Sequence, residues 1–388
     1  MLAPMSGRIH SNSSARNAQG SPSVTRSEFA LFLGVGTAAI FLATGNQLVE
    51  NLRQPLLLAI VLLWFFAVIL WCAVSVVRHA DCLAVKFGEP YGTLILTLSA
   101  ITIEVTMISM AMLHGANNPE LGRDAIFAVV MIALGGFVGL CLSLGGLRYR
   151  EQRYNLQGVN SYLNVIMTLA VLGLVLPNFT VSTDGPTFSA PQKIFLVVMS
   201  FSLYGIFLLI QTLRHSQYFM ESQEVVIRSA STHHQLQMRS TPYHAAMLVI
   251  YLIVVVILAE KFAIPLDNSI EQFGMPPAFG GAIIAGLVLA PEALGAVHAT
   301  LNNQLQRSVN ILFGSVLATI GLTIPAVLTI SLITQRPIVL GVERGNLPLL
   351  LLTLGVSVVT FTSGKTNVLQ GCVHLFLFAV FLLLIFSP

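Results

Sequence analysis

Long apolar runs separated by short polar segments occupy almost the whole chain after its first 27 residues. A helix needs about 20 consecutive apolar residues to cross the hydrocarbon core of a bilayer. Eleven runs have the character of such spans, and they lie at 29–48, 55–77, 92–113, 124–146, 161–180, 191–212, 244–262, 278–298, 309–333, 347–362 and 368–386. The pattern predicts an all-α polytopic membrane protein with about eleven transmembrane helices.

Two polar segments interrupt this pattern. Residues 1–27 are rich in Ser, Asn and Gly, which is typical of a disordered tail. The first helix and its loop, within 28–54, are expected to be retained, because the polar lead-in is long and no small-residue cleavage site follows. A transit peptide is the alternative, since the tail carries Arg and Ser and no acid. The second polar segment, 214–243, is expected to be a connector loop.

The distribution of basic residues predicts the orientation. If the N-terminus is cytoplasmic, thirteen of the nineteen Lys and Arg residues lie on the cytoplasmic side and six lie outside. Cytoplasmic loops of membrane proteins carry an excess of Lys and Arg. We therefore expect a cytoplasmic N-terminus and an external C-terminus.

The connector leaves five predicted helices on each side of it, within 55–213 and 244–388. Because five is odd, two copies of a five-helix unit would run in opposite directions through the membrane. Such inverted repeats are a transporter architecture, with the substrate site near mid-membrane between the repeats. A sequence echo, Asn155-Leu-Gln-Gly158 and Asn367-Val-Leu-Gln-Gly371, also favours a repeat.

Composition agrees with a membrane protein and excludes other classes. Apolar residues make up 55% of the chain and charged residues 9%, with a mean hydropathy of +0.83, whereas a soluble domain carries about 25% charged residues. A net charge of +3, spread over loops, gives no support for nucleic-acid binding. The four cysteines form no CxxC pair, so neither a disulfide framework nor a zinc site is expected.

Three smaller motifs receive structural interpretations. The segment 363–366 resembles the end of a P-loop, but Val359 stands where the first glycine is needed, so nucleotide binding is rejected and no cofactor is expected. The GxxxG pattern at Gly135 and Gly139 is typical of close helix packing. The histidines in and beside the connector have no metal-ligand spacing and are interpreted as part of a solvated loop; they are His215, His233, His234 and His244.

Two glutamates are the strongest candidates for function. Of the sixteen Asp and Glu residues, only Glu104 and Glu292 lie in the middle of predicted spans, each twelve residues after a glycine, Gly92 or Gly280. A charged side chain at the bilayer centre costs about 2.5–3.5 kcal/mol or more. No Lys or Arg lies mid-span to neutralise them. A functional site is therefore favoured over the structural alternative, an interhelical hydrogen bond from a protonated acid.

Their chemistry suggests exchange of a cation for protons. Two carboxylates in a low-dielectric cavity cannot both stay ionised and unpaired, so they hold either protons or a cation. Calcium needs six to eight oxygen ligands, and two glutamates supply at most four. Hydroxyl candidates for the remaining ligands, each with helix packing as its alternative, are Thr97, Thr102, Ser315 and Thr319. His298 and His374 are candidates for proton handling, although His374 inside a span is more often a satisfied core histidine.

Several segments together resemble the Ca²⁺/proton exchanger family of the cation/Ca²⁺ exchanger superfamily, and within it the ChaA-type bacterial antiporters. They are Val76–Asp81, Gly88–Gly92 with Glu104, Pro291–Gly295, Leu301–Arg307, Gly314–Thr319 and Gly364–Gly371. The resemblance covers nearly the whole chain from the second helix on. It implies an eleven-helix exchanger fold with two α-repeats, whose essential acids map onto Glu104 and Glu292. It also implies exchange of Ca²⁺, and in some members Na⁺ or K⁺, for protons, in a bacterial inner membrane.

The chain departs from the wider family at two positions that bear on selectivity. Repeats of the family often read Gly-Asn-Ala-x-Glu, whereas Ile101 and Leu289 replace the asparagines here. The loss of two neutral oxygen ligands makes Ca²⁺ less strongly specified. We expect an antiporter, not an enzyme, that exports Ca²⁺ in exchange for protons. The alternatives are a Na⁺ or K⁺/proton antiporter that uses the same glutamates, a cation channel, and an intramembrane enzyme.

Overall fold

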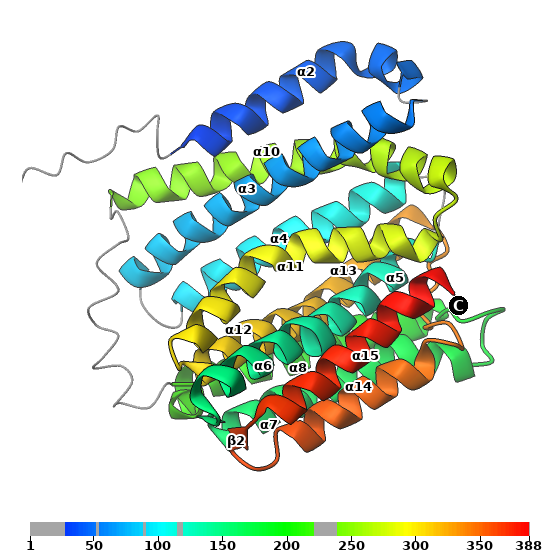
Figure 1. The fold of residues 1–388 in the computed structure, drawn as a ribbon. Coiled ribbons are helices and arrows are strands. Elements are labelled where there is room, and N and C mark those ends of the chain that lie inside the picture. Colours follow the sequence, from blue (N-terminus) through cyan, green and yellow to red (C-terminus); the bar gives the residue numbers. More distant parts are fainter. Residues whose placement is uncertain (1–27, 52–53, 88–90, 115–118, 221–238, 388) are drawn as a thin grey trace, which may run out of the picture.

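The computed structural model describes residues 28–51, 54–87, 91–114, 119–220 and 239–387. Most of these residues are helical, and the helices lie side by side as long rods (Figure 1). The first half contains α3 (Pro55–Phe87), α4 (Tyr91–His114), α5 (Leu121–Val130), η1 (Met131–Phe137), α6 (Val138–Tyr149), β1 (Gln152–Arg153), α7 (Leu156–Ala170), η2 (Val171–Val175), η3 (Leu176–Phe179), α8 (Ala190–Leu209), η4 (Ile210–Arg214) and η5 (Ser216–Tyr218).

The second half and one additional helix complete the described residues. The second half contains α10 (Thr241–Phe273), α11 (Pro277–Leu301), α12 (Leu305–Ala318), η7 (Thr319–Thr323), α13 (Ile324–Thr334), α14 (Leu347–Thr360), β2 (Lys365–Thr366) and α15 (Val368–Phe386). The additional helix, α2 (Phe29–Asn51), precedes both halves and lies at the edge of the bundle against α3 and α10 (Figure 1).

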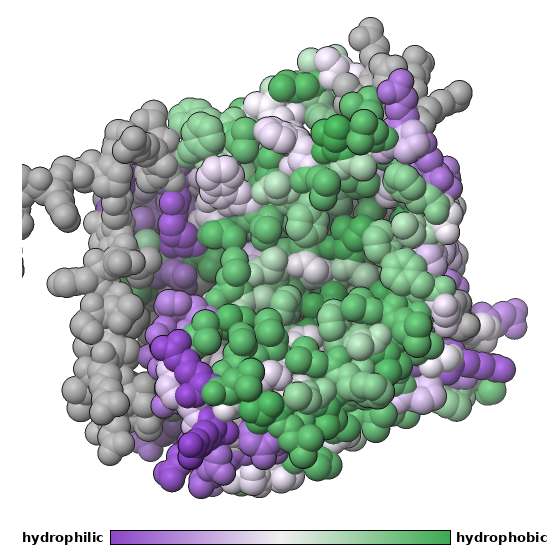
Figure 2. Space-filling model, in the orientation of Figure 1, coloured by the Kyte–Doolittle hydropathy of each residue, from purple (hydrophilic) through white to green (hydrophobic). Residues whose placement is uncertain are grey.

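The predicted spans are confirmed as helices. Eight uninterrupted helical segments among the described residues, some of them made of several labelled helices, are long and apolar enough to cross a membrane. Three shorter apolar helices, Phe29–Thr44, Leu98–Ser109 and Leu347–Thr360, lie where the other three spans are predicted. Figure 2 shows a broad apolar band between two polar margins, as expected for a surface in contact with lipid.

The rod formed by α5, η1 and α6 lies at the centre of the bundle. In its most apolar stretch 89% of the residues are buried, against 22% for the rod that starts with α8. Its GxxxG pattern explains this placement, because a Cβ added to Gly139 would lie 2.8 Å from the backbone nitrogen of Leu375 on α15. The close-packing interpretation of this motif is therefore confirmed.

Corresponding helices of the two halves run in opposite directions. The long helices α3 and α10 pack against each other and are antiparallel, and the same holds for α4 and α11 (Figure 1). Each pair consists of the first or the second helix of each half. The helix directions therefore agree with the predicted inverted repeats.

The sequence echo has a different meaning from the one predicted. Asn155 caps α7 and Asn367 caps α15, each through its side-chain oxygen. The strands just before them pair antiparallel, with Gln152 opposite Thr366 and Arg153 opposite Lys365. The two segments therefore meet on one face of the bundle, whereas corresponding segments of inverted repeats lie on opposite faces. The echo is a helix-capping motif used twice.

Candidate functional site

Glu104 is buried on α4 and contacts the second half of the chain. Its side chain lies against η7, and Thr319 donates a hydrogen bond of 2.9 Å to its Oε2. Only 4% of Glu104 is exposed. Its second oxygen, Oε1, is buried and has no hydrogen-bond partner among the described residues. This carboxyl group is thus held at one oxygen and open to a ligand at the other.

The hydroxyl of Thr319 can serve both protonation states of Glu104. It lies 2.9 Å from Glu104 Oε2 and 3.0 Å from the backbone oxygen of Ser315, and it has one hydrogen to donate. When Glu104 is ionised, Thr319 donates to the carboxylate. When Glu104 carries a proton on Oε2, that proton can be donated to Thr319 Oγ1, while Thr319 donates to Ser315 O. Neither state leaves Oε2 or the hydroxyl without a partner.

Glu292 approaches the same region from α11. Pro291 precedes it, so the carbonyl of Leu287 lacks its usual helical donor. Its Oε2 is also buried without a hydrogen-bond partner among the described residues. Glu104 and Glu292 lie close enough for their charges to interact, and α11 contacts α4 directly. The two carboxyl groups thus approach each other from opposite halves of the chain.

Thr323 is a candidate that the sequence analysis missed. It lies four residues after Thr319 in the π-helix η7, so both hydroxyls project from the same side. Its side chain is fully buried and faces Glu104, but its Oγ1 meets no strict hydrogen-bond geometry. The spacing from Thr319 was the one signal in the sequence that pointed to it.

Two of the predicted hydroxyl ligands are not placed at the carboxylates. Thr102 is exposed and donates to Leu98 O at 2.6 Å on its own helix. Two residues along an α-helix correspond to about 200° of rotation, so Thr102 faces away from Glu104. Ser315 offers its carbonyl to Thr319, and among the described residues its hydroxyl has no hydrogen bond to either glutamate. The side chain of Thr97 lies outside the described part of the structure.

The two candidate histidines lie apart from this carboxyl pair. His374 is fully buried, with Nδ1 2.7 Å from Leu134 O and Nε2 3.1 Å from Thr360 Oγ1. The carbonyl can only accept, so the proton is on Nδ1 and Thr360 donates to Nε2. This is the arrangement of a satisfied core histidine. His298 lies exposed at the end of α11, with Asn302 Nδ2 at 3.1 Å.

The side chains at the site are two carboxyl groups, of Glu104 and Glu292, and neutral hydroxyl groups. Among the ion pairs of the described residues, none contains Glu104 or Glu292. A buried carboxylate without a cationic side chain needs a proton or a bound cation. The described residues of the site offer carboxyl and hydroxyl oxygens and no cationic side chain.

Comparisons with known proteins agree on one family. A family described as sodium/calcium exchanger protein matches residues 57–213 and 243–387. The chain is 45% identical to y4hA of Sinorhizobium fredii over 332 residues, 85% of this chain and 90% of that protein. It is 40% identical to the sodium-potassium/proton antiporter ChaA of Escherichia coli over 334 residues, 86% of this chain and 90% of ChaA. The crystal structure of the Ca²⁺/H⁺ antiporter protein YfkE has the same fold, with a TM-score of 0.68, 19% identity, and coverage of 94% of this chain and 99% of YfkE.

Proposed function

The chain belongs to the sodium/calcium exchanger protein family, and from this membership we propose that it exchanges cytoplasmic Ca²⁺ for external protons through Glu104 and Glu292. It is an integral membrane antiporter of the cation/Ca²⁺ exchanger superfamily. The choice of cation, the two-glutamate site and the direction of exchange make up the proposal. It involves no enzymatic step and no resident cofactor.

The observation that carries the proposal is the pair of unpartnered carboxyl oxygens. Glu104 Oε1 and Glu292 Oε2 are both buried without a hydrogen-bond partner among the described residues. Two carboxylates balance the charge of one Ca²⁺ ion, or they bind two protons. Thr319, Thr323 and the carbonyl of Leu287 are further oxygen ligands, and water completes a shell of six to eight oxygens.

Exchange follows if the site opens to one side at a time. The site lies between α4 of one half and α11 and η7 of the other, so a movement of one half against the other can change its access. Moving two charges out against about 100 mV costs roughly 4.6 kcal/mol, at 2.3 per charge. Protons that enter with the field offset this cost.

A second candidate is a Na⁺ or K⁺/proton antiporter with the same site. The relative ChaA is a sodium-potassium/proton antiporter, and two neutral oxygen ligands of the wider family are absent here at Ile101 and Leu289. YfkE is a Ca²⁺/H⁺ antiporter, and the paired carboxylates favour a divalent ion. A cation channel is less favoured, because inverted halves are an arrangement of carriers.

We place the protein in a bacterial inner membrane with a cytoplasmic N-terminus and an external C-terminus. The distribution of Lys and Arg supports this orientation. The relatives are bacterial. Figure 1 shows the start of α2 and the end of the chain on opposite faces of the bundle, as an odd number of spans requires.

The test is proton-gradient collapse in everted vesicles after separate additions of Ca²⁺, Na⁺ and K⁺. The wild type is compared with Glu104→Gln and Glu292→Gln, and Glu271→Gln at an exposed position of α10 is the matched control. Collapse by Ca²⁺ alone, absent in both site variants, supports the proposal. A response to Na⁺ or K⁺ alone favours the second candidate. Wild-type exchange by both site variants would refute the two-glutamate site, and currents above carrier rates would indicate a channel.

A further inference from the structure

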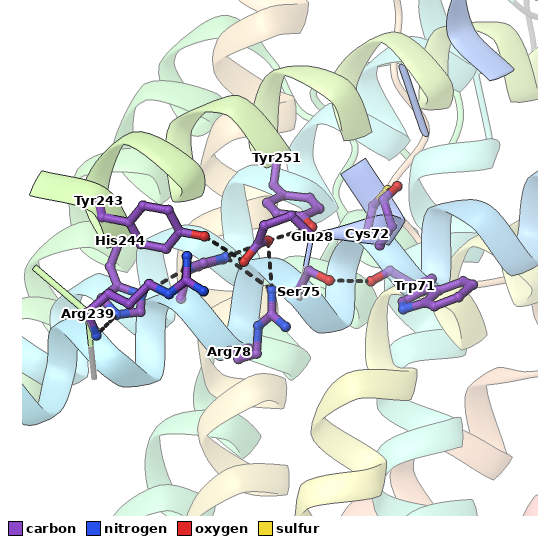
Figure 3. Close-up of polar contacts among 11 residues, drawn as sticks. Glu28, Trp71, Cys72, Ser75, Arg78, Arg239, Tyr243, His244 and Tyr251 are labelled. Atoms are coloured by element: carbon purple, nitrogen blue, oxygen red, sulfur yellow. Dashed lines mark hydrogen bonds and ion pairs between the residues drawn. The ribbon is translucent and has the colours of Figure 1, made fainter. Parts of the chain in front are cut away.

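A buried carboxylate at the start of α2 binds side chains of α3 and α10. Glu28 is 3% exposed, and it accepts hydrogen bonds from Tyr243 at 2.8 Å, Arg78 at 2.9 Å and Tyr251 at 2.9 Å. His79 Nε2 lies 3.3 Å from the same carboxylate. Figure 3 shows Arg78, Tyr243 and Tyr251 converging on Glu28.

Burial alone would raise the pKa of Glu28, but these donors outweigh it and hold the pKa below its ordinary value. Glu28 is therefore ionised near neutral pH.

Behind Glu28, two buried histidines contact each other through ring nitrogens. His79 Nδ1 and His244 Nδ1 are 2.9 Å apart, and the two residues are 1% and 3% exposed. The expectation that His244 belongs to a solvated loop is therefore wrong. It lies in the first turn of α10, which packs along α3. His233 and His234, which were assigned to the same solvated loop, lie outside the described residues.

Backbone geometry fixes where the protons of this pair lie. The N–H of Arg239 donates to His244 Nε2 at 3.1 Å, so that nitrogen accepts and a neutral His244 carries its proton on Nδ1. His244 Nδ1 then donates to His79 Nδ1. A neutral His79 carries its proton on Nε2 and donates it to Glu28. The reverse order would place an N–H of His244 against the N–H of Arg239, so the order from His244 to His79 to Glu28 is favoured, although it sets His79 Nε2–H beside Arg78 Nη2 at 3.2 Å.

The neutral arrangement has no place for an additional proton. A proton added to His79 would place two N–H groups face to face at 2.9 Å, and a proton added to His244 would face the N–H of Arg239. A proton on Glu28 would replace an acceptor where four donors converge. Protonation of His79 breaks the contact that joins α3 to α10, and protonation of Glu28 breaks a bond from the residue before α2 to α3 or α10. Protonation of His244 breaks the bond from Arg239 that holds its ring in place.

The surrounding charges add to this effect. The groups that act on the two histidines are Glu28 before α2, Arg78 and Lys86 on α3, and Arg239 before α10. Tyr243 and Tyr251 of α10 complete the ring around His79. Arg239 lies over the Tyr243 ring, and Lys86 donates to the carbonyl of Arg239. Three cationic side chains and one carboxylate act on the two histidines, so a charged histidine is repelled inside the closed cluster.

We infer that Glu28, His79 and His244 form a second proton-binding site, separate from Glu104 and Glu292, that holds α2 against α3 and α10 when neutral and releases it when protonated. Glu28 lies outside the matched residues of the family, 57–213 and 243–387. Resting on the proposed function, the inference adds that acidification on this face slows exchange. The reason is that α3 and α10 pack against α4, which carries Glu104, so loosening them disturbs the transport site.

The fluorescence of the two tryptophans can report the separation of α2 from α3. The chain's two tryptophans, Trp64 and Trp71, both lie on α3 and contact α2. Trp64 donates to Thr37 Oγ1 at 3.1 Å, and Trp71 lies 5.8 Å from the Phe29 ring. Separation of α2 changes the surroundings of both indoles. Intrinsic tryptophan fluorescence therefore measures the contact directly, without any transported cation.

The experiment follows the emission maximum of the purified full-length protein from pH 8 to pH 5.5 without Ca²⁺. We expect a reversible shift in the wild type, in the control His215→Gln, and in the double variant Glu104→Gln/Glu292→Gln. We expect the shift to be lost in His79→Gln and in His244→Gln. If either glutamine variant elutes as aggregate in size-exclusion chromatography, the asparagine variant at that position replaces it, because its amide reaches the place of Nδ1.

The outcomes separate this site from the proposed function. No shift in the wild type, or a shift that persists in both histidine variants, would overturn the proton site. A shift lost only in the glutamate double variant would assign the proton to the transport site and would also overturn it. If the shift behaves as expected but vesicles show no exchange, the proposed function fails and the proton site stands. In exchanging vesicles, the slowing below neutral pH should be absent in His79→Gln and His244→Gln.

Discussion

Thr319 Oγ1 lies 2.9 Å from Glu104 Oε2, although the two residues are 215 positions apart and belong to opposite halves of the chain. The contact joins the acid-bearing helix of the first half to a π-helix of the second. Any movement of one half against the other must keep, stretch or break this bond. Thr319 is therefore both a candidate ligand and a contact between the two halves.

Removal of this hydroxyl should weaken cation binding. Thr319→Val keeps the shape of the side chain but leaves Glu104 without its donor. A hydrogen bond to a charged group is worth about 1.5–3 kcal/mol, so the cation concentration for half-maximal exchange should rise at least about tenfold. Thr319→Ser should recover most of the loss. The control is Thr102→Val, which should match wild type because Thr102 is exposed and faces away. Equal effects of the two valine variants would contradict the placement.

Substitution of His374 tests whether it has a structural role. His374→Phe leaves Leu134 O and Thr360 without partners, which should lower stability by about 1–3 kcal/mol. The pH profile of exchange by the surviving protein should be unchanged. Thermal melting measured by size-exclusion chromatography gives the first quantity, and the vesicle assay gives the second. A displaced pH profile would show that His374 takes part in proton transfer.

Close packing at Gly139 should tolerate no side chain. A Cβ at this position would lie 2.8 Å from Leu375 N and 3.0 Å from Gly371 O. Because backbone atoms cannot easily move aside, Gly139→Ala should cost about 1–3 kcal/mol of stability. Gly355→Ala on α14 is the matched control, with open space around the new Cβ. It should be neutral or stabilising by about 0.4–1 kcal/mol. The measurement compares the melting temperatures of Gly139→Ala and Gly355→Ala with that of the wild type. A lower melting temperature in both variants would contradict the prediction.

Stability should depend on pH through Glu28. The folded protein holds the pKa of Glu28 below its ordinary value of 4.5, because Tyr243, Arg78, Tyr251 and His79 together outweigh the opposing effect of burial. The ionised group thus stabilises the fold fully above pH 4.5, and this contribution is lost as the pH falls through the lower folded value. Glu28→Gln should lower stability at pH 7 by about 1–3 kcal/mol. The difference from wild type should shrink on acidification below 4.5, as measured by melting at several pH values. A constant difference would argue against an ionised Glu28.

The sequence was informative where a pattern is local. Long apolar runs defined the helices, and rare mid-span acids defined Glu104 and Glu292 because burying a charge is costly. The position of Thr319 followed from a hydroxyl in the next helix. Thr102 was misplaced because closeness in sequence was given more weight than the 100° turn per residue of an α-helix. Thr323 was missed although its four-residue spacing from Thr319 predicts that both hydroxyls lie on one side of a helix.

Contacts between distant segments were beyond the reach of the sequence. Nothing near His244 indicates that it meets His79, which lies 165 positions earlier. Polar neighbours suggested a solvated loop, but α10 begins early enough to bury this residue against α3. The echo at Asn155 and Asn367 was misinterpreted for a related reason. Both asparagines cap helices, a local need that occurs wherever a helix begins and that carries no information about repeats.

The paired strands β1 and β2 have a mechanical consequence. They tie the first half to the second at one face of the bundle, where Tyr154 N also donates to Gly364 O and Lys365 pairs with Glu151. The helices α7 and α15 both start at this tie. Their origins cannot separate while the strands stay paired, so the tie acts as a pivot. If one half rocks against the other as proposed, the displacement is largest at the far ends of these helices, near the opposite surface of the membrane.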